Sequence, residues 1–154
     1  MRKLEVFLKN LKDFKNNLEW LKKSLKKCQG LVDKDPKSLT DSQLEAIEAL
    51  FSRFSRSVDM LINRILRGID ILEFEDVGTK LDIAIRAEKR GFVENFEELM
   101  ALKDLRNELA HEYVGERLHE KLKEVIYASK KLLKISERVI SYAENELLPK
   151  FKRN

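Results

Sequence analysis

Apolar residues recur every three or four positions along most of the chain, which is the spacing of one face of an α-helix. The first stripe predicts a helix over about residues 3–29, which Gly30 ends, and the second predicts a helix over about residues 40–69. The first stripe consists of Leu4, Phe7, Leu11, Phe14, Leu18, Leu21, Leu25 and Cys28. Trp20 falls off this stripe, so it either covers a second interface or is partly exposed.

Three further helices follow a connection at residues 70–76. A short helix is expected at about residues 77–90, a fourth from about residue 95 to Gly115, and a last one over about residues 116–148. Glycine and proline mark the ends of these segments, as they do in most helical proteins. We therefore expect an all-α, up-and-down bundle of about five helices, three long and two shorter.

Two helix starts carry the pattern of a capping box, in which a polar side chain and a Glu or Gln three residues later satisfy each other's backbone N–H groups. Thr40 with Gln43 begins the second helix in this way, and Asn95 with Glu98 begins the fourth. Both pairs predict where the helices start.

The chain length of 154 residues suits a single domain, residues 1–154, and 43% hydrophobic residues are enough for a core. Cys28 is the only cysteine, so an intrachain disulfide is excluded, and its place on the stripe favours a core residue over a nucleophile. No apolar run approaches the length of a membrane span or of a signal peptide, and we expect a cytoplasmic protein without membrane contact.

Charge is unevenly distributed. Residues 1–30 carry nine basic and three acidic side chains, whereas residues 91–120 carry three basic and eight acidic ones. The basic first helix either attracts RNA phosphates or merely solvates an outer face. The acidic balance in the second region argues against a broad basic cradle for nucleic acid there.

The segment from Arg106 to Tyr113 holds the candidate chemistry, because it combines four functional side chains within eight residues. Arginine binds phosphate through a bidentate fork, and histidine can act as a general acid or base near neutral pH. Asn107 could orient His111 or hold a sugar. We name Arg106, Asn107 and His111 as candidate catalytic residues.

Each of these residues also has a purely structural reading. Arg106 could pair with Asp104 or with a glutamate on another helix, and Asn107 with His111 could form a hydrogen-bonded pair inside the bundle. Tyr113 could be an ordinary core aromatic residue.

On an ideal helix, Arg106 and Tyr113 lie within about 20° of one another, whereas Arg106 and His111 are about 140° apart. They can grip one phosphate only if the helix unwinds near His111 or if a second subunit completes the site. One histidine beside Glu108 is a weak ligand set, and we expect neither a metal nor a cofactor. His119 has no recognisable partner and is expected at the surface.

The spacing Arg-Asn-x-x-x-His-x-Tyr resembles the motif of the HEPN superfamily, and within it the HepT-like branch. The stretches Arg53–Leu61 and Ala87–Phe92 are also similar to that branch, and the likeness covers about residues 40–145. The resemblance implies a two-fold homodimer that places the motif in a shared cleft.

The same resemblance implies a function. HepT-like toxins cleave RNA without metal, and a minimal nucleotidyltransferase antitoxin neutralises them by transferring AMP to the motif tyrosine, here Tyr113. A second possibility is a non-catalytic subunit that presents a nucleotide or substrate to such a nucleotidyltransferase. A third is a purely structural helical dimer.

Overall fold

The computed structural model describes residues 2–76 and 78–152 and confirms the all-α class. Helix accounts for 82% of the chain, and the described residues contain no strand. Val77, where we expected the third helix to begin, lies outside the described residues. The α-helices are α1 (Arg2–Cys28), α2 (Asp41–Met60), α3 (Arg67–Leu72), α4 (Lys80–Lys89), α5 (Glu97–Leu109) and α6 (Arg117–Tyr142).

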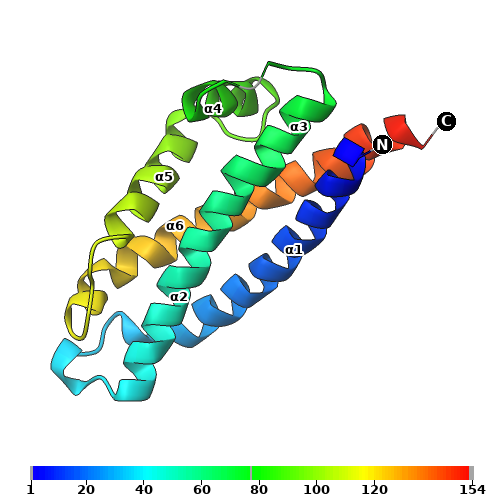
Figure 1. Ribbon diagram of the computed structural model, residues 1–154. Coiled ribbons are helices and arrows are strands. Elements are labelled where there is room, and N and C mark those ends of the chain that lie inside the picture. Colours follow the sequence, from blue (N-terminus) through cyan, green and yellow to red (C-terminus); the bar gives the residue numbers. More distant parts are fainter. Residues whose placement is uncertain (1, 77, 153–154) are drawn as a thin grey trace.

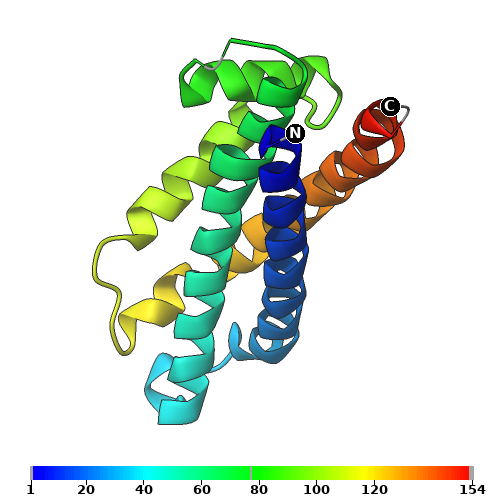
Figure 2. The same ribbon diagram turned by 45° about the vertical axis from the view of Figure 1, so that its right-hand side comes forward.

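The long helices alternate in direction, as the up-and-down prediction requires (Figure 1). α1 and α2 form an antiparallel pair, α5 lies on the other side of α2, and α6 crosses behind α2 to bring the C-terminal end near the start of α1. The short helix α4 covers one end of the bundle, above α5 (Figures 1 and 2). α2 therefore has neighbours on several sides and is the central helix.

The second helix is longer than its apolar stripe indicated. α2 continues without a break through a π-helical segment, η3 (Leu61–Leu66), into α3, so the rod ends at Leu72 and not near residue 69. At the end of η3 the backbone N–H of Arg67 donates to the carbonyl of Ile62, five residues earlier. Such segments are rare and are often found at functional sites.

The last helix also extends further than expected. α6 continues through a π segment, η4 (Ala143–Leu147), into a final 3₁₀ turn, η5 (Leu148–Phe151). Pro149 does not end the helix but lies in the first positions of that turn, where its missing N–H needs no partner.

Of the two predicted capping boxes, the one at the start of α2 is present and the one at the start of α5 is not. Thr40 and Gln43 form the expected capping box, with hydrogen bonds of 3.0 and 3.1 Å. At α5 the Asn95 side chain does not cap the helix. Glu98 instead accepts hydrogen bonds from the backbone N–H groups of Glu94 and Asn95, at 2.6 and 3.3 Å.

The core is one cluster of buried apolar side chains that takes residues from all six α-helices. The first stripe is buried as predicted from Phe7 to Cys28, whereas Trp20 is half-exposed. Lys23 and Arg53 lie over the Trp20 ring, 4.5 and 5.0 Å from its centre, so this side chain is shielded by cations and not by a second interface in the bundle.

His119 is not the isolated surface residue that the sequence suggested. Its Nε2 lies 2.9 Å from the carbonyl oxygen of Leu31, and the side chain is partly buried. The first turn of α6 packs beside the connection between α1 and α2, and this contact could not be read from residues so far apart in the chain.

Cys28 is a core residue, and its titration gives a test of the fold. Burial raises the pKa of the thiol from 9.0 to about 11, and its Sγ lies 3.3 Å from the carbonyl oxygen of Ala46. Because the folded state holds the thiol proton more tightly, the contribution of this thiol to stability is fully present below about pH 9. That contribution is lost as the pH rises from about 9 to 11. The free energy of unfolding, measured with urea, should therefore fall by up to about 3 kcal/mol across this pH window.

The matched control is Cys28→Ala, which removes the titrating group. That variant is less stable at pH 7 but should lose little additional stability between pH 9 and 11. Equal pH dependence in both proteins would contradict the assignment of the thiol as the responsible group.

A buried ion-pair cluster fixes α4 to the end of the central rod. The Asp70 carboxylate on α3 is 1% exposed and accepts hydrogen bonds from Arg86 at 3.1 Å and Arg90 at 2.6 Å. Glu73 pairs with Arg90 at 3.0 Å and accepts a hydrogen bond from the Tyr142 hydroxyl at 2.6 Å. The cluster thus joins α3, α4 and the end of α6, in a region where the sequence indicated only a connection.

Candidate functional site

The motif does not lie on one continuous helix. We expected the fourth helix to reach Gly115, but α5 ends at Leu109. The N–H groups of Ala110 and His111 donate to carbonyls three residues earlier, at 3.2 and 3.1 Å, and residues 112–114 are outside any helix. Tightening of the last turn in this way is common where a helix ends.

The end of α5 follows from the sequence and from the chain reversal before α6. His111, Tyr113 and Val114 have weaker helix propensity than residues such as leucine, and Gly115 adopts a φ of 56°, which favours glycine. The extended segment lets Tyr113 pack partly against the core, and the guanidinium of Arg117 lies 5.8 Å from the centre of its ring. The estimate of 140° between Arg106 and His111 therefore does not apply.

Arg106 forms a two-pronged ion pair with a residue that the sequence did not single out. Its Nε and Nη2 donate to the two carboxylate oxygens of Asp59 on α2, at 2.9 and 3.0 Å. These hydrogen bonds raise the pKa of Arg106 above its ordinary value. An ion pair was one of the structural readings, but the partner is neither Asp104 nor a glutamate.

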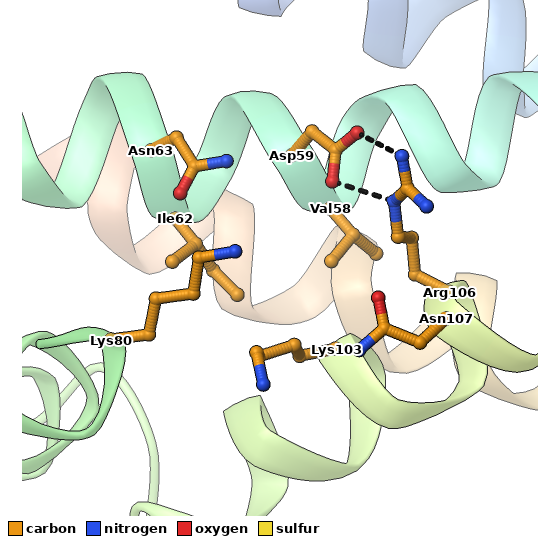
Figure 3. A pocket seen from close by; sticks show the side chains of 8 residues that line it. All are labelled: Val58, Asp59, Ile62, Asn63, Lys80, Lys103, Arg106 and Asn107. Atoms are coloured by element: carbon orange, nitrogen blue, oxygen red, sulfur yellow. Dashed lines mark hydrogen bonds and ion pairs between the residues drawn. The ribbon is translucent and has the colours of Figure 1, made fainter.

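Arg106 and Asn107 line a hollow of about 190 Å³ between α2, α4 and α5. Figure 3 shows Asp59 and Asn63 above it, Lys103 and Asn107 below, and Lys80 reaching in from the start of α4. Two lysines and one arginine thus surround a single carboxylate that is already paired. The hollow suits an anionic group.

His111 and Tyr113 line a second hollow, of about 270 Å³, closer to the start of α2. Its α2 side is formed by Glu48, Phe51, Ser52 and Ser55, and His111 itself is exposed. Asn107 is exposed as well, so the reading in which Asn107 and His111 pair inside the bundle is wrong.

A third hollow shares lining residues with each of the other two. It shares Ser52 and Ser55 with the His111 hollow, and it shares Asp59, Asn63 and Arg106 with the Arg106 hollow. The three hollows adjoin one another along the polar side of α2, and together we call them the α2 groove. The polar residues on its α2–η3 side include Glu48, Ser52, Ser55, Arg56, Asp59 and Asn63, and its other side includes Arg106, Asn107, His111 and Tyr113.

All four motif residues therefore face the α2 groove of a single chain. Arg106 and Asn107 reach it from α5, and His111 and Tyr113 reach it from the loop that follows. Arg106 and His111 line different hollows of the groove, and the helix ends between them.

The acidic residues around the motif mostly turn away from the groove. Glu108 pairs with Lys121 on α6 at 2.6 Å, and Glu98 pairs with Lys131 at 3.1 Å while it caps α5. Among the eight acidic side chains of residues 91–120, Glu112 is the one that lines a hollow of the groove. The acidic side chains of residues 91–120 thus add less negative charge to the groove than the composition of that region suggested.

The residues on the α2 side of the groove were not predicted from the sequence as part of a site. A signal was present, because Ser52, Ser55, Asp59 and Asn63 recur every three or four residues on the side of the helix away from its apolar stripe. A polar stripe of this kind is usually a solvated face, and only its position opposite Arg106 marks it as part of a site.

Residues 2–76 and 78–152 contain no group of three or more His, Cys, Asp or Glu side chains placed to hold a metal ion. In the same ranges no helix is both long and apolar enough to span a lipid bilayer.

Comparison of the chain with models of protein families, with curated proteins and with solved structures finds no match.

Proposed function

We propose that the chain is a HepT-like protein of the HEPN superfamily and that it cleaves RNA without a metal ion. One observation supports this most directly. The α2 groove contains an arginine, Arg106, and an exposed histidine, His111, which line adjoining hollows on the polar side of α2. Neither residue has to move to another face of the protein.

The groups in the groove fit the steps of such a reaction. A histidine can take the proton from the 2′-hydroxyl, whose oxygen then attacks the adjacent phosphorus and displaces the 5′-oxygen of the next nucleotide. Arg106 uses Nε and Nη2 for Asp59, which leaves Nη1 to donate to a phosphate oxygen. Asp59 thus holds the guanidinium in one orientation while the rest of the fork stays available.

A homodimer is part of the proposal. General acid–base cleavage needs one group that accepts a proton and another that protonates the leaving oxygen. The α2 groove contains one histidine per chain, and a two-fold axis beside it would supply the second. The dimer is therefore expected because each chain contributes one histidine to the groove, and not because of the helical angle between Arg106 and His111.

The direct test is cleavage of single-stranded RNA by the purified protein in the presence of EDTA. We expect cleavage to persist and to leave 2′,3′-cyclic phosphate ends, which follow from attack by the 2′-oxygen. A reaction that stops in EDTA and resumes with Mg²⁺ would contradict the mechanism.

One observation favours the second function, a non-catalytic partner of a nucleotidyltransferase. The charge of Arg106 is balanced by Asp59, so the site attracts a phosphate less strongly than an unpaired arginine would. Under this reading the purified protein binds nucleotide without cleaving RNA. The EDTA experiment distinguishes the two, because only the first predicts cyclic phosphate ends.

Regulation by AMP transfer belongs to the same proposal. The phenol oxygen of Tyr113 would attack the α-phosphorus of ATP, pyrophosphate would leave, and the phenolic proton would pass to solvent. Because Tyr113 lines the hollow that contains His111, the attached AMP would occupy space that the RNA needs. Its phosphate would also add negative charge to the groove.

Tyr113→Phe should therefore keep most RNA cleavage but escape neutralisation by a cognate nucleotidyltransferase. Intact-mass spectrometry after co-expression should show added AMP on the wild type and none on the variant. Tyr127→Phe is the matched control, because Tyr127 is 70% exposed and lies outside the groove. Modification that persists in Tyr113→Phe and disappears in Tyr127→Phe would overturn the assignment.

A further inference from the structure

A fourth hollow, of about 490 Å³, lies between the start of α1 and the η3–α3 part of the central rod. It is within the size range of small-molecule sites, which is about 300–1,000 Å³. Apolar groups form much of its lining, namely Val6, Phe7, Gly68 and Ile71. The Phe7 ring lies so close to Gly68 that a Cβ there would stand 2.7 Å from a ring carbon.

The rim of this hollow is cationic. Arg2, Lys3, Arg64 and Arg67 line it, and its lining includes no acidic side chain. Other arginines of the chain are neutralised, such as Arg86, Arg90 and Arg106. Across residues 2–76 and 78–152, by contrast, no ion pair within 4.0 Å involves any of the four rim cations.

The hollow continues the α2 groove. Asn63 and Arg64, both in the π segment η3, line this hollow and also the central hollow of the groove. From Ser52 to Arg67 the rod advances roughly 22 Å at 1.5 Å per residue. A flexible strand that leaves the groove at Arg106 therefore meets the cationic rim next.

An apolar floor with a cationic rim matches the chemistry of a nucleotide. A nucleobase can place its face against apolar side chains while the neighbouring phosphates contact arginine and lysine. Single-stranded RNA can turn a base out of its stack to fill such a hollow, whereas the bases of a duplex are held inside the helix.

On the premise of the function proposed above, we propose that this hollow, the α1–η3 subsite, binds one nucleotide of the single-stranded RNA whose scissile phosphate lies in the α2 groove. The subsite selects unpaired RNA over duplex RNA and adds affinity at a distance from the reaction. Val6 and Ile71 contact the base, and Arg64 and Arg67 contact the flanking phosphates.

The test uses the full chain carrying His111→Ala, so that the RNA is not cleaved, and a fluorescently labelled single-stranded RNA. Fluorescence anisotropy gives the dissociation constant over a range of salt concentrations. In this background Arg64→Gln with Arg67→Gln should weaken binding by about 10-fold or more near 0.1 M salt. The slope of log K against log salt should become shallower by about 1.4, because two phosphate contacts on a single strand are lost.

Two further variants separate the subsite from general charge effects. Lys12→Gln with Lys26→Gln removes the same charge from exposed positions of α1 that do not line the hollow, and it should change the slope much less. Val6→Ser alters a side chain that is 52% exposed, so the fold should tolerate it. It should weaken binding about threefold and leave the salt slope unchanged, since it removes apolar contact and no charge.

The outcomes are distinct from those of the cleavage experiment. If RNA binding depends on Arg64 and Arg67 but no cleavage occurs, the subsite stands and the ribonuclease proposal fails. If cleavage occurs but both double variants weaken RNA binding equally, the subsite is wrong. Equal affinity for duplex and single-stranded RNA would overturn it, as would tight binding to phosphatidylserine vesicles that depends on Arg64 and Arg67 while RNA binding does not.

Discussion

Replacement of His111 by alanine is expected to reduce RNA cleavage roughly 10²- to 10⁴-fold, the usual contribution of a general acid or base. His111 is exposed in the loop after α5 and lines the groove that also contains Arg106, so its removal leaves the shape of the site largely intact. Initial rates on a labelled single-stranded RNA, at saturating concentration, would measure the change in kcat.

The matched control is His119→Ala. His119 lies on α6 and contacts the carbonyl of Leu31, away from the groove, so its loss should cost about 1 kcal/mol of stability and leave cleavage unchanged. Full activity in His111→Ala, or an equal loss in both variants, would remove His111 from the mechanism.

Replacement of Asp70 by alanine should have the largest effect on stability, about 3–5 kcal/mol. Its carboxylate is buried and compensates two guanidinium groups, Arg86 and Arg90, which are 22% and 14% exposed. Without it, two charges of the same sign would remain close together and poorly hydrated. Urea unfolding followed by circular dichroism would measure the loss.

Glu75→Ala is the control within the same cluster. Glu75 lies 3.9 Å from Arg86 with its side chain 51% exposed, so the pair should contribute at most about 1 kcal/mol. Equal destabilisation by the two substitutions would show that burial of Asp70 is not what makes the cluster important.

The sequence predicted the fold through its stripes. Spacing of three and four residues located every long helix, and Thr40 with Gln43 located the start of α2. Helix ends were predicted less well, because they depend on tertiary contacts. α3 continues to Leu72 since Asp70 is held by arginines of α4, and no local pattern around residues 70–76 announces those partners.

The candidate site was predicted in part. The motif identified Arg106, Asn107, His111 and Tyr113, and all four face one groove, but treating them as a continuous helix gave the wrong geometry. Helical spacing describes residues that stay on a helix, and the chain leaves it after Leu109. The other side of the groove comes from residues more than forty positions earlier, including Asp59, whose pairing with Arg106 is a tertiary contact.

The π segment η3 has an evolutionary consequence. A hydrogen bond to the fifth residue back accommodates one more residue than a regular turn of helix, so Leu61–Leu66 has the form of an α-helix with a single inserted residue. In an ancestor without that residue, the residues from Arg67 onward would keep their faces relative to Asp59, because the wider turn absorbs the insertion locally. When relatives of this chain are aligned, a one-residue gap within Leu61–Leu66 would therefore mark those with a regular helix in place of the π segment, and the residues on both sides of the gap would keep the same faces.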